Sequence, residues 1–234
     1  MFMHFDPLYW MLMIPAMLAA MGATVLVKGT FAHYARRHAR SGVTGAQAAR
    51  TVLARSGIRD VEIVPGTGFL SDLYDPLHKV IRLSPDVYAS SSLSAIGVAC
   101  HEAGHAVQHA RGFFPLHLRN TMVPVVQFST SLSWIMIFGG MILRSMQLAQ
   151  LGVLLFGFLV FYQIITLPVE LDASRRALAL MTENELVTRE EKSGARWVLS
   201  AAALTYVAAA FTAVMQLLYF MMRTGMLGGR RDER

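Results

Sequence analysis

Four long stretches of the chain carry no charged side chain: residues 7–27, 120–143, 145–169 and 197–222. As an α-helix, which rises about 1.5 Å per residue, each can cross the ~30 Å hydrocarbon core of a bilayer. Buried helices of a soluble protein are the alternative, but they rarely stay uncharged for about 18 residues, and here the pattern occurs four times. The pattern therefore predicts four transmembrane helices.

The region between the first two apolar stretches, residues 28–119, mixes polar and apolar positions over shorter distances. Thr44 is a favourable N-cap for a helix that continues to Arg55. A group of serines then precedes a segment with helical apolar periodicity, which predicts a second helix that begins near Leu93 and ends near Gly112.

Between these two helices the sequence has strand character. Branched and aromatic residues predict a strand at residues 61–65 and a hairpin formed by residues 69–73 and 79–83. Asp75 and Pro76 are typical turn residues and supply the connection of the hairpin. The fold class is therefore a mainly α membrane protein, with about four transmembrane helices and a small cytosolic α+β region that carries a short β-hairpin.

The expected division of the chain follows from these elements. The parts are a first transmembrane helix (1–27), a polar region with helices and strands (28–119), a transmembrane helical hairpin (120–169), a polar helix (170–196), and a fourth transmembrane helix with a basic tail (197–234).

Composition strengthens the case for a membrane protein. Hydrophobic residues make up 54% of the chain and charged residues 15%. A soluble domain averages about 45–50% apolar and about 25% charged residues. Cys100 is the single cysteine, so an internal disulfide is excluded. The net charge of +6 is compatible with nucleic-acid binding. However, the basic residues cluster beside the apolar stretches, which is typical of residues that set the orientation of a membrane protein. We therefore expect the lipid bilayer and not nucleic acid as a partner, with the oligomeric state left open.

The basic residues also predict an orientation. Of the 21 lysines and arginines, eleven lie between the first two apolar stretches and five between the third and fourth. By the positive-inside rule these two loops face the cytoplasm, and both termini face outside. The basic tail, with Arg230, Arg231 and Arg234, opposes this orientation but carries fewer charges. The sequence predicts a multi-pass protein of the cell (inner) membrane whose polar regions are cytoplasmic.

The motif "HEAGH" supplies the candidate chemistry. On a helix His101 and His105 lie about 40° apart on one face, so their imidazoles can share a zinc ion. Glu102 is rotated about 100° from His101, where it can accept a proton from a zinc-activated water. A polar helix face with incidental histidines is the alternative. The helical setting after a hairpin favours one Zn²⁺ per chain, held by His101 and His105 with Glu102 as general base.

A third metal ligand must come from another segment. His109 lies one further turn along the helix, too far from a metal centred between the first two histidines. The metzincin pattern is excluded because Arg111 stands where its third histidine would be. The open candidates are His117, Glu170, Asp172, Glu183 and Glu185. Glu170 is the best of them, because it ends the third apolar stretch on the same side of the membrane, where a carboxylate is costly unless it is paired or metal-bound.

The segments "HEAGHA", "LPVELDASRRAL" and "AALTYVAAA" together resemble the YugP-like membrane zinc metallopeptidases, and the resemblance covers nearly the whole chain. More distantly the chain is similar to the HtpX-type gluzincins. The resemblance implies a gluzincin-like core with His101, His105 and Glu170 as zinc ligands. The sequence departs from these families at Ser174, where the gluzincins have aspartate, and at Leu73, where the family segment has histidine.

The resulting functional hypothesis is a membrane-embedded zinc-dependent endopeptidase (HExxH type) that acts on protein or peptide substrates, with its active site facing the cytoplasm. Tyr206 and His117 are the candidates to stabilise the oxyanion, and the strand at 69–73 is a candidate edge for pairing with substrate. The alternative is a non-catalytic scaffold or transporter with a structural zinc site. An intramembrane protease is disfavoured, because the apolar run before His101 is too short to span a bilayer.

Overall fold

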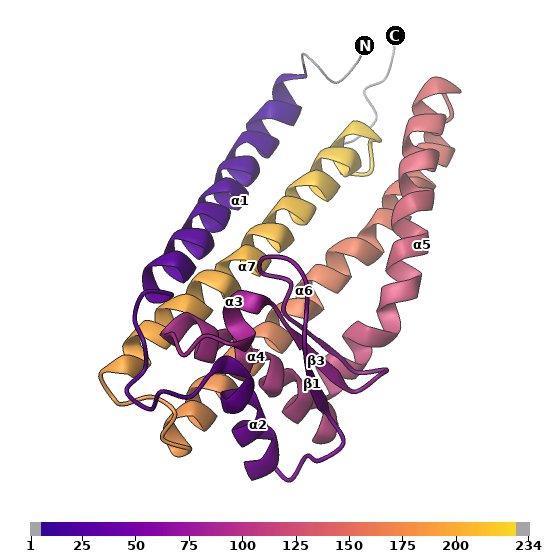
Figure 1. The fold of residues 1–234 in the computed structure, drawn as a ribbon. Coiled ribbons are helices and arrows are strands. Elements are labelled where there is room, and N and C mark those ends of the chain that lie inside the picture. The colour runs from indigo at the N-terminus through magenta and orange to yellow at the C-terminus, as the bar shows by residue number, and fades with distance from the viewer. Residues whose placement is uncertain (1–5, 228–234) are drawn as a thin grey trace. The chain divides into compact units, whose positions relative to one another are not determined.

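Four helices in the structure are long and apolar enough to cross a membrane. The structure is a computed structural model that describes residues 6–227, and Figure 1 shows its ribbon. The four helices are α1 (Pro7–Tyr34), α5 (Phe114–Ile142), α6 (Met146–Glu183) and α7 (Glu191–Arg223). They confirm the number of apolar helices that the sequence predicts. The basic tail at residues 228–234 lies outside the described residues.

These helices extend beyond the uncharged stretches. The third stretch ends at residue 169, but α6 continues to Glu183 through a charged segment rich in alanine, leucine and arginine. These residues are strong helix formers, so the helix does not end where the apolar stretch ends. The same helix therefore carries both a candidate membrane span and the segment that contains Glu170.

The described chain divides into two compact units. One comprises residues 6–22, 118–167 and 206–227, and the other comprises residues 23–117 and 168–205. In the first unit Trp134 packs against Phe138, Phe156 and Phe220. The side-chain amide of Gln150 donates to the carbonyl of Thr224 and so satisfies a polar group in an apolar helix.

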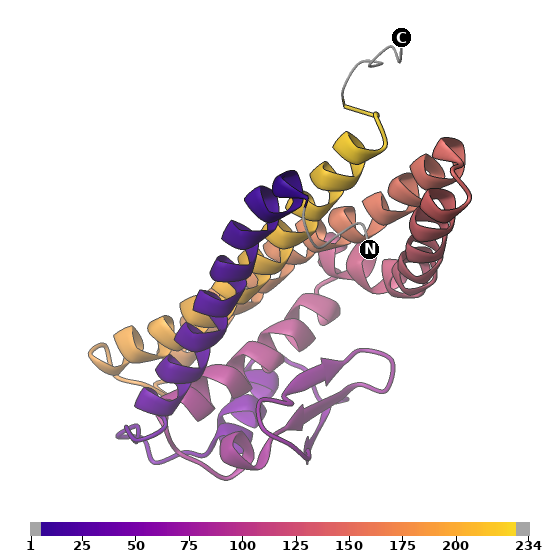
Figure 2. The ribbon, with the colours of Figure 1, turned by 90° about the horizontal axis from the view of Figure 1, so that it is seen from above.

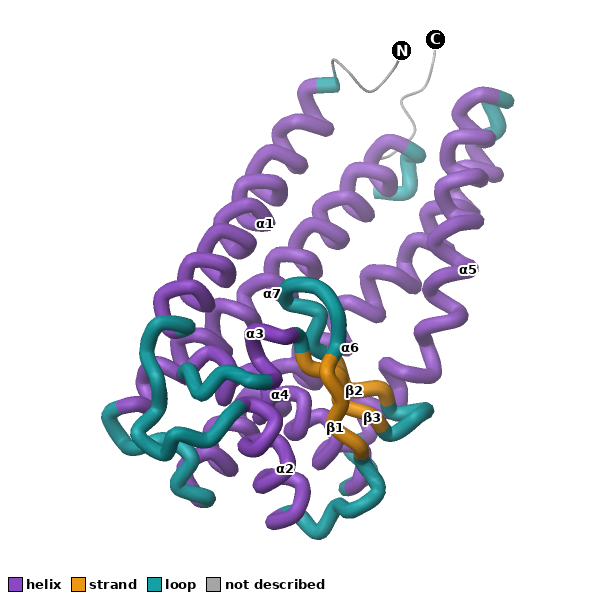
Figure 3. Tube along the Cα trace, viewed as in Figure 1, coloured by secondary structure: helices purple, strands orange, loops and turns teal. Residues whose placement is uncertain are grey.

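The second unit contains a three-stranded sheet, coloured orange in Figure 3. Its strands are β1 (Glu62–Pro65), β2 (Leu73–Asp75) and β3 (Val80–Leu83). The order is β1-β3-β2, with β1 parallel and β2 antiparallel to β3. β2 is therefore an edge strand, next to β3 alone.

The predicted first hairpin strand at 69–73 is wrong, because the strand begins at Leu73. Phe69 lies in a turn with Leu70, whose φ is +52°, and the Phe69 ring packs edge-on against Phe31. The predicted turn is confirmed. The Asp75 carboxylate accepts hydrogen bonds from the backbone N–H groups of Leu77 and His78 and so fixes the turn immediately after β2.

Short helices complete the second unit. α2 (Gly45–Arg55) begins at Thr44 with a reciprocal capping box to Gln47, which confirms the predicted N-cap. α3 (Pro85–Tyr88) is a single turn. α4 (Leu93–Ala110) begins after Ser92, whose side chain accepts the N–H of Ala95, and is buried on nearly all sides. It contacts α2, α3, β2 and β3 (Figure 2).

α4 and α6 cross closely where Gly104 faces Ala173. A Cβ atom at position 104 would lie 2.8 Å from the carbonyl oxygen of Ala173. A real side chain cannot occupy that space unless the two backbones move apart. Gly104 therefore permits the approach that brings Glu170 towards the histidines of α4.

Replacing Gly104 with alanine is expected to lower the melting temperature in thermal unfolding, because overpacking typically costs about 1–3 kcal/mol of unfolding free energy. Gly97→Ala on the same helix is the matched control, since its Cβ would meet its nearest atoms only at 4.0 Å. Both changes raise helix propensity equally. Equal melting temperatures for the two variants would contradict a tight crossing at Gly104.

Candidate metal centre

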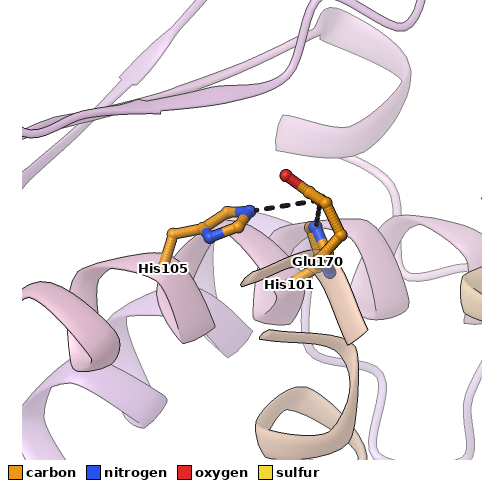
Figure 4. Close-up of side chains that lie close together, drawn as sticks. All are labelled: His101, His105 and Glu170. Carbon is orange, nitrogen blue, oxygen red and sulfur yellow. Dashed lines mark hydrogen bonds and ion pairs between the residues drawn. The ribbon is translucent and has the colours of Figure 1, made fainter. Parts of the chain in front are cut away.

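Three side chains from α4 and α6 converge at one point. The Nε2 atom of His101 lies 3.2 Å, and that of His105 3.6 Å, from Oε2 of Glu170. The two imidazole centroids are 4.7 Å apart, and one ligand atom from each residue lies within 4.8 Å of the others. Figure 4 shows both rings directed towards the carboxylate. The structure therefore brings together the three ligands predicted from the sequence.

Local structure explains this convergence. His101 and His105 are one helical turn apart on α4, so they project from the same face. On α6, Val169 and Ala173 are fully buried, and Glu170 is held between them on the inward side with only 3% of its surface exposed. A carboxylate this deeply buried requires positive or hydrogen-bonding partners, and the two imidazoles are those partners.

Ser174 supports the first histidine. Its Oγ atom lies 3.2 Å from Nδ1 of His101, one turn after Glu170 on α6. A hydroxyl therefore makes the contact at this position. A hydrogen bond at Nδ1 orients the ring and leaves Nε2 directed at Glu170.

Gln108 supports the second histidine, and the sequence reasoning missed it. Its Oε1 atom lies 3.0 Å from Nδ1 of His105, and its amide nitrogen donates to the carbonyl of Val169 and to Asp172. Asp172 in turn pairs with Arg176. The available signal was position, because a glutamine three residues after a histidine lies on the same side of a helix.

The donor set fits a divalent zinc ion. Two imidazole nitrogens and one carboxylate oxygen are a ligand combination that zinc accepts in catalytic sites, where a fourth position stays open. Both Nδ1 atoms already have hydrogen-bond partners, so the Nε2 atoms are the ones that face the carboxylate. Burial of the two imidazoles would be unfavourable without hydrogen-bond partners for their nitrogens. His101, His105 and Glu170 could therefore hold a metal ion.

Glu102 lies next to this group on α4 and is also buried, with 8% of its surface exposed. Burial raises the pKa of its carboxyl group to about 7, and His101 and a hydrogen bond from the backbone N–H of Tyr74 on β2 oppose that rise. The carboxyl group is therefore poised between its protonated and ionised forms near neutral pH.

The other predicted histidines lie outside the group of three. Nδ1 of His109 lies 2.8 Å from the hydroxyl of Tyr74, and its ring lies 5.4 Å from the exposed ring of His117. Burial lowers the pKa of His109 and raises that of Tyr74 to about 12, so both groups favour their neutral forms. His109 therefore belongs to a contact between α4 and the sheet.

The remaining candidate ligands do not join the metal group. Asp172 is turned to Gln108 and Arg176 instead. Glu183 and Glu185 are exposed at the end of α6 and in the turn that follows. Tyr206 lies on α7, in the unit that does not contain the three ligands, and its role stays a prediction.

Comparisons with known proteins agree with this chemistry. A family model described as "Putative neutral zinc metallopeptidase" matches residues 9–225. The "Putative membrane protease YugP" of Bacillus subtilis (strain 168) is 45% identical over 216 residues, which cover 91% of this chain and 96% of that protein. No solved structure matches the chain significantly. The chain belongs to this neutral zinc metallopeptidase family, and the resemblance noted from its motifs is confirmed.

Replacing Gln108 with methionine is expected to weaken zinc binding about 10- to 100-fold, because the imidazole of His105 loses the acceptor that orients it. Affinity would be measured by competition with a chelator of known zinc affinity. His109→Ala, one position further along α4, is the control and should bind as the unmodified chain does. Unchanged affinity in Gln108→Met would show that the glutamine does not position His105.

Proposed function

We propose that the protein is a membrane-embedded, zinc-dependent endopeptidase of the HExxH type. His101, His105 and Glu170 hold one zinc ion, and Glu102 is the general base. The observation that carries this proposal is the buried group of two imidazoles and a carboxylate with Glu102 beside it. Membership of a zinc metallopeptidase family supports the same reaction class.

When bound, zinc would act as a Lewis acid on water and on the peptide carbonyl. Glu102 accepts a proton from the attacking water and delivers it to the leaving amine. Burial raises the pKa of Glu102 above that of an exposed glutamate, which favours the uptake of the proton. Gln108 and Ser174 keep the two imidazoles fixed while the proton moves.

The edge strand β2 is a suitable place for the substrate backbone. The Tyr74 N–H is directed at Glu102, so the edge of β2 that does not pair with β3 lies on the side of the general base. An extended peptide added to this edge would lie beside the general base. We therefore assign substrate pairing to residues 73–75 in place of 69–73. Tyr206 and His117 stay the candidates that stabilise the oxyanion.

A non-catalytic scaffold with a structural zinc site is the alternative. A structural site closes its fourth position and needs no acid–base residue. Here a carboxyl group with a raised pKa is buried beside the three ligands, which favours catalysis.

We also propose that the protein is a multi-pass protein of the cell membrane, with the catalytic unit on the cytoplasmic side. Four helices of suitable length and composition and a membrane-protease relative support the membrane location. The distribution of lysine and arginine supports the orientation.

Glu102→Gln is expected to abolish peptide hydrolysis and to retain about one zinc ion per chain, because the base is lost and no ligand is. Casein hydrolysis and metal content would be measured on the same purified sample. Hydrolysis near the normal rate would rule out Glu102 as the base. A sample of the unmodified chain that binds zinc but shows no hydrolysis would favour the scaffold.

Glu170→Ala is expected to lose zinc and activity together, because it removes the only carboxylate among the three proposed ligands. Asp172→Ala is the matched control on the same helix and should retain zinc, since its carboxylate lies against Gln108 and Arg176. Metal content would be compared at equal folding, judged by thermal melting without chelator. Loss of zinc from Asp172→Ala but not from Glu170→Ala would reverse the ligand assignment.

The orientation is testable with single introduced cysteines. Cys100 is fully buried, and burial raises the pKa of its thiol, so it should react little. In intact cells a membrane-impermeant maleimide should label Leu143→Cys, between α5 and α6, where the side chain is 72% exposed. It should label the exposed position Ala89→Cys only after the membrane is opened. The reverse pattern would place the active site outside.

A further inference from the structure

A hollow of about 440 Å³ lies between α6 and α7 in the second unit, apart from the three metal ligands. Its apolar lining comes from both helices, with Leu171 and Leu178 on α6 and Leu199 and Ala203 on α7. Ser174 and Ser200 add hydroxyl groups. The hollow is therefore largely apolar inside.

Three cationic side chains line the same hollow: Arg175, Lys192 and Arg196. Among the described residues, 6–227, none of the three forms an ion pair. The acidic groups that adjoin them in sequence have other partners. Asp172 pairs with Arg176, and Glu191 accepts the backbone N–H groups of Arg40 and Thr188. The positive charge of the hollow is thus available to an anionic ligand.

The position of the hollow favours a lipid over a soluble anion. It lies next to the last residue of the uncharged stretch of α6, at 169, and the first residue of the uncharged stretch of α7, at 197. Leu171, which lines the hollow, is 53% exposed, and Trp197, which follows Arg196 on α7 and faces the side of α1, is 60% exposed. Tryptophan is typical of the interface between lipid and water. A soluble anion would gain nothing from this exposed apolar border, whereas a phospholipid presents phosphate and hydrocarbon together.

We propose that this hollow binds the headgroup of an anionic phospholipid. Arg175, Lys192 and Arg196 hold the phosphate, and arginine suits this role because its guanidinium can donate two parallel hydrogen bonds to phosphate oxygens. Leu171 and Leu178 contact the start of the acyl chains. Basic pockets between membrane helices are a recognised setting for such lipids. The proposal does not depend on proteolytic activity.

The test uses the full-length protein in detergent micelles, titrated with phosphatidylglycerol or phosphatidylcholine and examined by native mass spectrometry. The unmodified chain is expected to retain phosphatidylglycerol in preference to phosphatidylcholine. The triple variant Arg175→Gln/Lys192→Gln/Arg196→Gln should lose that preference, with affinity for phosphatidylglycerol at least about tenfold weaker. The control Arg55→Gln/Arg59→Gln/Arg82→Gln removes three exposed cations of the same unit that do not line the hollow, and it should retain the preference.

A second variant separates charge from folding. Ser200→Trp leaves every cation in place and fills the hollow from an exposed position, and it should also weaken phosphatidylglycerol binding. Melting temperature and zinc content would be measured for each variant to establish that it is folded. Either pocket variant, if folded, is sufficient to test the proposal. Equal retention of phosphatidylglycerol by the pocket variants and the control would overturn the proposal. Displacement of the lipid by millimolar inorganic phosphate or by an acidic peptide would overturn the assignment to lipid.

Discussion

The buried carboxylate of Glu170 is the constraint on which the site depends. Only 3% of this residue is exposed, and an ionised carboxylate removed from water is strongly destabilising unless partners compensate it. The imidazoles of His101 and His105 are those partners. They reach it because α4 and α6 cross closely at Gly104, where any larger side chain would meet the backbone of Ala173. Removal of Glu170 would take away the carboxylate that both Nε2 atoms face, so the positions of the three residues depend on one another.

The polar groups behind the ligands extend this dependence along α6. Ser174 contacts His101, and the carbonyl of Val169 accepts the amide of Gln108, which contacts His105. Three residues within a six-residue segment of α6, positions 169–174, therefore contribute a carbonyl, a carboxylate and a hydroxyl to the same group of side chains. This arrangement orients both rings from a single rigid element, which is the most precise way to hold ligands that come from the other helix.

The sequence was sufficient for the parts of this structure that depend on local pattern. Periodicity and spacing located the four apolar helices, the N-cap at Thr44 and the two histidines on one helix face. It failed for the strand at 69–73, because the position of β2 is fixed by the Asp75 turn and by the packing of Phe69 on Phe31. The Asp75 turn is local and was predicted, but the contact of Phe69 with Phe31 is long-range and leaves no periodic signal.

The site shows the same division. Glu170 could be predicted because a carboxylate at the end of an apolar stretch needs a reason to be there. For Gln108 the sequence offered only its position three residues after His105, and that signal is weak because a glutamine on a helix is ordinary until the tertiary structure gives it partners. Asp172 was a reasonable candidate ligand by residue type, but rotation along α6 turns it to Gln108 and Arg176 instead.

α6 also relates the metal centre to the hollow that we assign to lipid. Glu170 and Ser174 face α4, while Leu171, Arg175 and Leu178 line the hollow against α7. Ser174 belongs to both, because its hydroxyl contacts His101 and its side chain also lines the hollow. A lipid in the hollow would therefore contact Ser174, whose hydroxyl also contacts His101, one of the three proposed metal ligands.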